Sequence, residues 1–159
     1  MATQSFNAKV LTVSDGVVAG TREDASGQAL VDCLTHAGAT VVDRRVCSDG
    51  TDVVAVALKE LAEGFSGVIV TTGGTGFAPR DQTPEGTKLV IDREAPGLAE
   101  AMRNINPLGR LSRGVVGITG SAIIVNTPGS PKGCVEQLEA IIDVLPHAVA
   151  LLAETPTTH

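Results

Sequence analysis

The stretch that most constrains the fold is TTGGTGFAPRDQTPEGT, residues 71–87. It follows a short apolar run, residues 67–70, of the kind that forms a buried strand in a parallel sheet. Its glycines expose the backbone N–H groups of the turn to an anion, because no Cβ blocks the approach. Thr83, Pro84 and Glu85 then predict a helix start, with Thr83 as the N-cap and Pro84 at the first helical position. A strand that leads through a glycine loop into a capped helix is typical of a ligand site.

The rest of the chain alternates between apolar runs and helical patterns. Strands are predicted at residues 8–13, 40–46, 67–72, 115–119 and 122–126, and helices at 26–37, 52–63, 84–93, 98–104 and 131–152, the last kinked at Pro146. This order predicts an α/β fold of three α-β-α layers, with mostly parallel strands and right-handed crossovers. Only Gly120 and Ser121 separate the last two strands, which predicts an antiparallel hairpin in the sheet. We expect one domain over residues 1–159, with a loose tail at 154–159.

Polar residues follow the first two predicted strands. Ser14 and Asp15 come after the first strand and Asp49 after the second. Parallel strands place their carboxyl ends at one edge of the sheet, where ligands bind. For Ser14 and Asp15, turn formation and ligand contact are both open, and for Asp49 a cap or turn role is the simpler interpretation of the residues alone. We expect a flexible loop at residues 16–24 and a helix capped by Ser26.

A second informative stretch is NTPGSPKG, residues 126–133. Ser130 is predicted to cap a helix that Pro131 opens, after a turn at Pro128 and Gly129. Lys132 in the first turn opposes the helix dipole, but it would suit a phosphate bound by the free N–H groups there. The arginines at 110 and 113 are interpreted as solvated or as a subunit contact, with phosphate binding as the minor alternative.

Composition excludes several classes of protein. The net charge of −6, with three Phe, no Tyr and no Trp, argues against a nucleic-acid binder. No apolar run reaches the ~20 residues that span a bilayer, and the first residues lack a secretory pattern, so we expect a cytoplasmic protein without membrane contact. Neither the three cysteines nor the three histidines show disulfide or zinc spacing. An anionic substrate would therefore need backbone donors, a few cations or a metal.

Five segments of the chain resemble, in order, motifs of the MogA/MoaB family of molybdenum cofactor biosynthesis proteins, to which the gephyrin G domain is related. They are Ser14 with Asp15, DASG at 24–27, the stretch 71–87, DREAPG at 92–97 and PGSPKG at 128–133. The resemblance spans nearly the whole chain, and its ending at Leu145, Pro146 and His147 is more similar to MoaB. It implies a molybdopterin-binding-domain-like fold.

The resemblance also implies an activity and a site. Active members adenylylate molybdopterin with Mg-ATP and release pyrophosphate. Asp49 and Asp81 match the acidic residues considered catalytic, and both could hold Mg²⁺. Residues implied to bind molybdopterin or ATP are Ser14, Asp15, Thr72, Gly73, Gly74, Thr75, Gly76, Pro128, Gly129, Ser130 and Lys132. The implied assembly is a homotrimer, with a hexamer as a further option, and a downstream molybdenum-insertion protein would be a partner.

Two alternatives belong to other functional classes. One is an oligomeric molybdopterin-binding or scaffolding protein of the same pathway without catalysis, because fold and motif indicate a site more strongly than a turnover. The other is a generic nucleotide-binding doubly wound domain with a different substrate, which would leave the second motif unexplained. Pyrophosphate release that depends on Asp81 separates the first alternative from the enzyme, and binding screens against pterin and unrelated nucleotides test the second.

Overall fold

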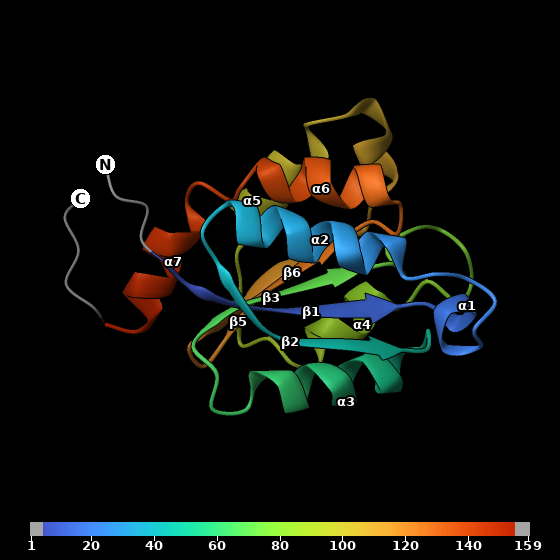
Figure 1. The fold of residues 1–159 in the computed structure, drawn as a ribbon, viewed down its shortest axis with the longest axis horizontal. Coiled ribbons are helices and arrows are strands. Elements are labelled where there is room, and N and C mark those ends of the chain that lie inside the picture. Colours follow the sequence, from blue (N-terminus) through green and yellow to red (C-terminus); the bar gives the residue numbers. More distant parts are fainter. Residues whose placement is uncertain (1–4, 155–159) are drawn as a thin grey trace.

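The computed structural model describes residues 5–154, which form a six-stranded sheet with helices on both faces (Figure 1). The strands are β1 (Asn7–Val13), β2 (Thr40–Cys47), β3 (Gly67–Thr72), β4 (Arg93–Glu94), β5 (Val116–Thr119) and β6 (Ala122–Thr127). The helices are α1 (Asp15–Val18), α2 (Ala25–His36), α3 (Thr51–Ala62), α4 (Thr83–Lys88), α5 (Pro96–Arg103), the 3₁₀ helix η1 (Pro107–Leu111), α6 (Pro131–Glu139) and α7 (Leu145–Leu152). No helix among these residues combines the length and apolar character needed to cross a bilayer.

The sheet confirms the predicted mixture of strand directions. Its order is β2-β1-β3-β6-β5-β4, and the neighbours from β2 to β6 are parallel. β5 runs antiparallel to β6, so the hairpin predicted at Gly120 and Ser121 is present, and β4 runs antiparallel to β5. Every residue of the central strand β3 is buried, which confirms the burial predicted for the apolar run 67–70 and extends it to Thr71 and Thr72.

Two apolar layers cover the sheet and confirm the α-β-α architecture. On one face, α2, α5, α6 and α7 bury residues such as Leu30, Leu138 and Leu145 against the strands. On the other face, α3 supplies Leu58 and Leu61, and α4 packs beside it. α2 and α3 each bury an apolar stripe, whereas α4 also buries Thr83 and Thr87, and α6 also buries Gln137.

The connections around β1 create a topological switch point. From β1 the chain passes through α2 to β2 on one side, and then through α3 to β3 on the other side of β1. α2 and α3 lie on opposite faces of the sheet (Figure 1). The loops that leave β1 and β3 therefore diverge, and in open α/β sheets such a crevice at the carboxyl ends is where ligands bind.

Two predicted helices are shorter than expected. The helix predicted at residues 84–93 ends at Lys88, because the chain then joins the sheet edge as β4. There the N–H of Asp92 donates to Ile118 O at 2.7 Å and that of Ala95 to Val116 O at 2.8 Å. The closing helix is not kinked but divided into α6 and α7, and Pro146 lies in the first turn of α7, where proline needs no N–H partner.

Three local predictions at helix starts are also corrected. The loop predicted as flexible at residues 16–24 begins within a short helix, α1. Asp24, not Ser26, caps α2, because its carboxylate accepts from Gly27 N at 3.1 Å and from Thr12 Oγ1 at 2.9 Å. Thr83 is the first residue of α4 rather than its N-cap. The tail predicted at 154–159 lies, except for Glu154, outside the described residues.

Candidate functional site

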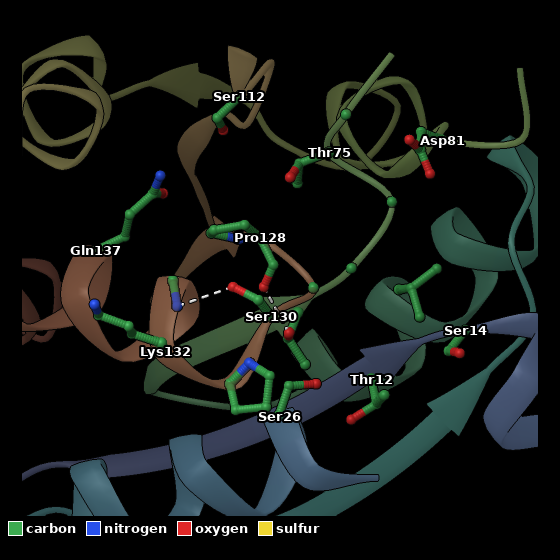
Figure 2. A pocket seen from close by; sticks show the side chains of 18 of the residues that line it. Thr12, Ser14, Ser26, Thr75, Asp81, Ser112, Pro128, Ser130, Lys132 and Gln137 are labelled. Carbon is green, nitrogen blue, oxygen red and sulfur yellow. Dashed lines mark hydrogen bonds between the residues drawn. The ribbon is translucent and has the colours of Figure 1, made fainter. Parts of the chain in front are cut away.

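A cavity of about 930 Å³ lies at the carboxyl ends of β1, β3 and β6 (Figure 2). Its wall consists of the end of β1, the loop after β3, the turn between β6 and α6, the first turns of α6, and the segment around η1. This volume is within the range of about 300–1,000 Å³ typical of small-molecule sites. The switch point of the sheet and the cavity therefore coincide.

The loop after β3 depends on two glycines in the left-handed region. Gly73 has φ 99° and Gly74 has φ 70°, which other residues adopt only with strain. A Cβ at Gly73 would collide with Val13 O, and one at Gly74 with Thr83 Oγ1. Thr83 Oγ1 instead donates to Gly73 O at 2.8 Å, and Thr83 N donates to Gly74 O at 3.0 Å. The hydroxyl predicted as a helix cap thus fixes the glycine turn.

Arg113 holds the other half of this loop. Its main-chain N–H donates to Thr75 O at 2.8 Å, its Nε to Gly76 O at 2.8 Å and its Nη2 to Asp81 O at 2.5 Å. Its guanidinium also pairs with Glu85 of α4 at 2.8 Å, and this cation holds the pKa of the Glu85 carboxyl below its usual value. Arg113 therefore holds the loop through these contacts while it stays exposed, as the solvated interpretation predicts, and the alternative of a subunit contact stays a prediction.

Asp49 is joined to the loop after β1. The N–H of Asp15 donates to Asp49 Oδ2 at 3.0 Å, and the N–H of Asp49 donates to Asp15 Oδ1 at 3.1 Å. Arg80 binds Asp15 with both Nε at 2.6 Å and Nη2 at 3.1 Å, and it also donates to Asp49 O at 3.1 Å. Asp49 is thus fixed by partners from the loops after β1 and β3, and it does not cap α3, whose N-cap is Gly50 without a side-chain cap bond.

The pKa values of the Asp15 and Asp49 carboxylates are shifted in opposite directions. The Arg80 hydrogen bond holds the pKa of Asp15 below its ordinary value. Burial raises the pKa of Asp49, and the negative charges of Asp15 and Asp81 raise it further. One Asp81 oxygen accepts from Ala78 N at 3.0 Å, and Asp81 also lines the cavity. Asp49 and Asp81 therefore place like charges on one wall, an arrangement that a bound cation would relieve.

The turn between β6 and α6 supplies donors on the opposite wall. Ser130 caps α6 as predicted, since its Oγ accepts from Gly133 N at 3.0 Å. Thr72 Oγ1 donates to Pro128 O at 2.8 Å and ties this turn to the end of β3. The Lys132 side chain is 86% exposed, and its Nζ forms only a long ion pair with Glu136 Oε1, at 3.8 Å. Because such an exposed pair is weak, the ammonium remains available to an anion in the cavity.

The structure brings together nearly all the residues predicted from the sequence. Those that line the cavity are Ser14, Asp49, Thr72, Gly73, Gly74, Thr75, Gly76, Asp81, Pro128, Gly129, Ser130 and Lys132. Asp15 is not part of the wall, and it contacts Asp49 and Arg80 instead. Ser14 both lines the cavity and caps α1, so the turn and ligand interpretations of this residue are compatible.

Sequence reasoning missed Leu108, Leu111 and Gln137, which also line the cavity. Their neighbours in the sequence form no recognisable motif, and only the fold brings η1 and α6 to this place. A weak signal exists for Gln137, because it is a polar residue at a position of α6 that faces the apolar core side of the helix.

The donor set is compatible with Mg²⁺, although it is not a complete protein cage. Asp49 and Asp81 provide carboxylate oxygens, the ligands that Mg²⁺ prefers. Among residues 5–154 no group of three or more His, Cys, Asp or Glu side chains could hold a metal ion. Mg²⁺ in phosphoryl-transfer sites commonly uses one or two carboxylates together with substrate phosphates and water, and these residues fit that pattern.

Comparisons with known proteins agree on one family. Residues 9–147 match the family described as "Probable molybdopterin binding domain". A molybdopterin adenylyltransferase of Helicobacter pylori is 35% identical over 156 residues, which are 94% of this chain and 89% of that protein. The molybdenum cofactor synthesis protein cinnamon of Drosophila melanogaster is 37% identical over 95% of this chain, which spans 26% of cinnamon. The crystal structure of the molybdopterin biosynthesis enzyme MoaB from Thermus thermophilus has a TM-score of 0.88 and 42% identity, covering 96% of this chain and 99% of that one.

Proposed function

The chain belongs to the family of molybdopterin binding domains that includes MogA and MoaB, and on this premise we propose that it is a molybdopterin adenylyltransferase. In the proposed reaction, an oxygen of the molybdopterin phosphate attacks the α-phosphorus of ATP. The new P–O bond forms as the bond to the bridging oxygen breaks, and pyrophosphate leaves with that electron pair. The products are adenylyl-molybdopterin and pyrophosphate.

The observation that carries the proposal is the placement of Asp49 and Asp81 on the wall of one cavity, beside the glycine loop. The reaction brings two anionic substrates together, and a protein of net charge −6 needs local groups that offset this charge. The backbone N–H groups of the loop, the N-terminal turn of α6 and the Lys132 ammonium are such groups.

The chain's own residues act in this proposal mainly by positioning. Phosphoryl transfer requires little covalent chemistry from the protein, so alignment and charge stabilisation supply most of the rate. Asp49 and Asp81 would hold Mg²⁺, which when bound neutralises phosphate charge and supports the leaving group. Arg113 and Arg80 would keep these two carboxylates in place through their contacts with Asp81 O and Asp15.

Pyrophosphate release tests the proposal. Purified protein is supplied with Mg-ATP and molybdopterin, and wild type is compared with Asp81→Asn. We expect release by wild type and a loss of at least roughly a hundredfold in the variant, which should remain folded because the amide oxygen can still accept from Ala78 N. Wild type that binds molybdopterin without releasing pyrophosphate would favour the binding or scaffolding alternative.

The assembly and surroundings of the protein stay predictions. We take the domain expected over residues 1–159 as the unit that carries the activity, and a homotrimer as its assembly. Sedimentation that shows a monomer at micromolar concentration would contradict the trimer. The cytoplasmic location and the molybdenum-insertion partner likewise rest on sequence reasoning.

A further inference from the structure

Buried polar side chains in this protein are almost all hydrogen-bonded. Nine such side chains occur among the described residues, at Thr12, Thr71, Thr72, Thr75, Thr83, Thr87, Asn126, Thr127 and Gln137. Seven of them bond to carbonyls, main-chain N–H groups or other side chains. The two that make no side-chain hydrogen bond within residues 5–154 are Thr75 and Gln137, and both line the cavity. Since an unpaired buried polar group is costly, both need a partner from outside the chain.

Gln137 is the less expected of the two. It lies in the second turn of α6 and is only 5% exposed. None of the fully buried side-chain nitrogen or oxygen atoms in the described chain lacks a partner, so the small exposed surface of Gln137 includes its amide. Figure 2 shows this side chain extending from α6 toward Ser112 at the edge of the cavity. A small depression that Gln137 also lines, with Met102 and Gly114, has no room for a water molecule, whereas the large cavity can admit a partner for the amide.

The 3₁₀ helix η1 adds apolar side chains to the cavity that Gln137 lines. Leu108 and Leu111 of η1 line the same cavity and are 73% and 54% exposed, so both are available to a bound ligand. η1 is fastened to α6 beside Gln137, because Asn106 Nδ2 donates to Glu136 Oε2 at 3.2 Å. Asp81 and Ser14 lie on the other side of the cavity (Figure 2). The cavity thus has carboxylates on one side, while its α6 and η1 side carries the Gln137 amide, the Lys132 ammonium and the apolar side chains of Leu108 and Leu111.

We propose that Gln137 hydrogen-bonds the edge of a planar heterocycle that packs against Leu108 and Leu111 of η1. A carboxamide presents one donor and one acceptor side by side, and it therefore matches an edge that offers the complementary pair. Both substrates of the proposed function contain such a ring, the adenine of ATP and the pterin of molybdopterin. The inference rests on that function for its two candidate ligands, and it makes Gln137 a residue that selects between rings.

Binding measurements with Gln137→Leu and Gln137→Glu test the inference. Leucine keeps the bulk but removes both polar groups, whereas glutamate keeps only acceptors when it is ionised. Dissociation constants are measured by calorimetry for Mg-ATP and for anaerobically released molybdopterin, separately. We expect Gln137→Leu to weaken binding of one of them by roughly tenfold or more and to leave the other within about twofold, because buried groups on the ligand lose their partners. Glu139→Leu, on the exposed side of α6, is the matched control and should bind both ligands as wild type does.

Thermal unfolding separates a binding role from a structural one. Because the amide has no partner in the described chain, Gln137→Leu should unfold at the same temperature as wild type or higher. Weaker ATP binding identifies the ring as adenine, and weaker molybdopterin binding identifies it as pterin. Unchanged binding of both ligands, or a lowered unfolding temperature, would overturn the inference while leaving the proposed function standing. Wild type that binds neither ligand would overturn both.

Discussion

The main chains of Asp15 and Asp49 exchange hydrogen bonds with each other's carboxylates, at 3.0 and 3.1 Å. This pair connects the loops after β1 and β2, and Arg80 adds the loop after β3 through its bidentate contact with Asp15. Asp15 does not line the cavity, so its carboxylate is not placed to touch a substrate. Its position points to a role in orienting Asp49.

Asp15→Ala is expected to lower kcat by roughly ten- to a hundredfold, the usual effect of removing a group that orients a metal ligand. The reason is that Asp49 N and Arg80 lose their shared partner. ATP binding should change much less than kcat, and calorimetry beside steady-state pyrophosphate release checks this difference. Asp43→Ala, which removes an exposed pair with Arg45, is the control. Equal losses in the two variants would show that Asp15 has no special role.

Arg113 is expected to act through Asp81, and a double-mutant cycle can show this. Arg113→Ala removes the donors to Gly76 O and Asp81 O and should lower kcat by roughly tenfold or more. In an Asp81→Asn background the same change should have little further effect, because the group it positions is already lost. Glu85→Gln weakens the ion pair but spares the loop contacts, and should keep most of the activity. Independent, multiplicative losses for Arg113 and Asp81 would contradict the coupling.

Much of the fold could be predicted because its signals are local. The β3 run is continuously apolar, and the Ser130–Pro131 cap and the two-residue hairpin at Gly120 have short-range chemistry. The break between α6 and α7 escaped prediction because apolar residues continue at helical spacing on both sides of it. β4 escaped because two residues carry no strand pattern, and only the edge of β5 makes them a strand.

The residues of the site likewise differ in whether the local sequence identifies them. Asp81 was found because it lies in a motif that resembles a family, and Asp49 because it follows a strand end and matches an acidic residue of that family; the roles of both stay predictions. Arg113 contacts carbonyls more than 30 residues away in the sequence, and its local context indicates only a charged surface. The place of Gln137 in the cavity wall depends on the packing of η1 beside α6. These two elements are far apart in the sequence, so no local pattern predicts that they meet.

Asp49→Asn is expected to raise the free energy of unfolding at pH 7. Burial first, then the charges of Asp15 and Asp81, raise the pKa of Asp49 above its ordinary value of 3.8. A raised folded-state pKa contributes stability that is complete below the unfolded pKa and is lost as pH rises through the folded pKa. Ionised Asp49 therefore costs stability at neutral pH, by less than about 1 kcal/mol because the side chain is partly exposed.

Urea unfolding at pH 7 and below pH 4 checks the sign. The gain of Asp49→Asn over wild type should shrink as the pH falls through the raised pKa. Asp15→Asn should behave in the opposite way, because Arg80 lowers the pKa of Asp15 and its contribution is present at neutral pH. Stabilisation by both variants, or by neither, would contradict this assignment of the two carboxylates.

Gly74→Ala is expected to damage both stability and activity. Gly74 has φ 70°, where alanine costs about 1–2 kcal/mol, and its Cβ would in addition collide with Thr83 Oγ1. Relief of the collision must displace either the glycine turn or the start of α4, and both position the cavity wall. We therefore expect a loss of roughly 2 kcal/mol or more in the free energy of unfolding, together with weaker ATP binding. Gly97→Ala, in α5 with nothing within 4 Å of the added Cβ, should be neutral or stabilising by up to about 1 kcal/mol. Equal stability and activity of Gly74→Ala and Gly97→Ala would contradict this prediction. It would mean that the turn does not require a left-handed residue at position 74 and that the loop can accommodate a Cβ there.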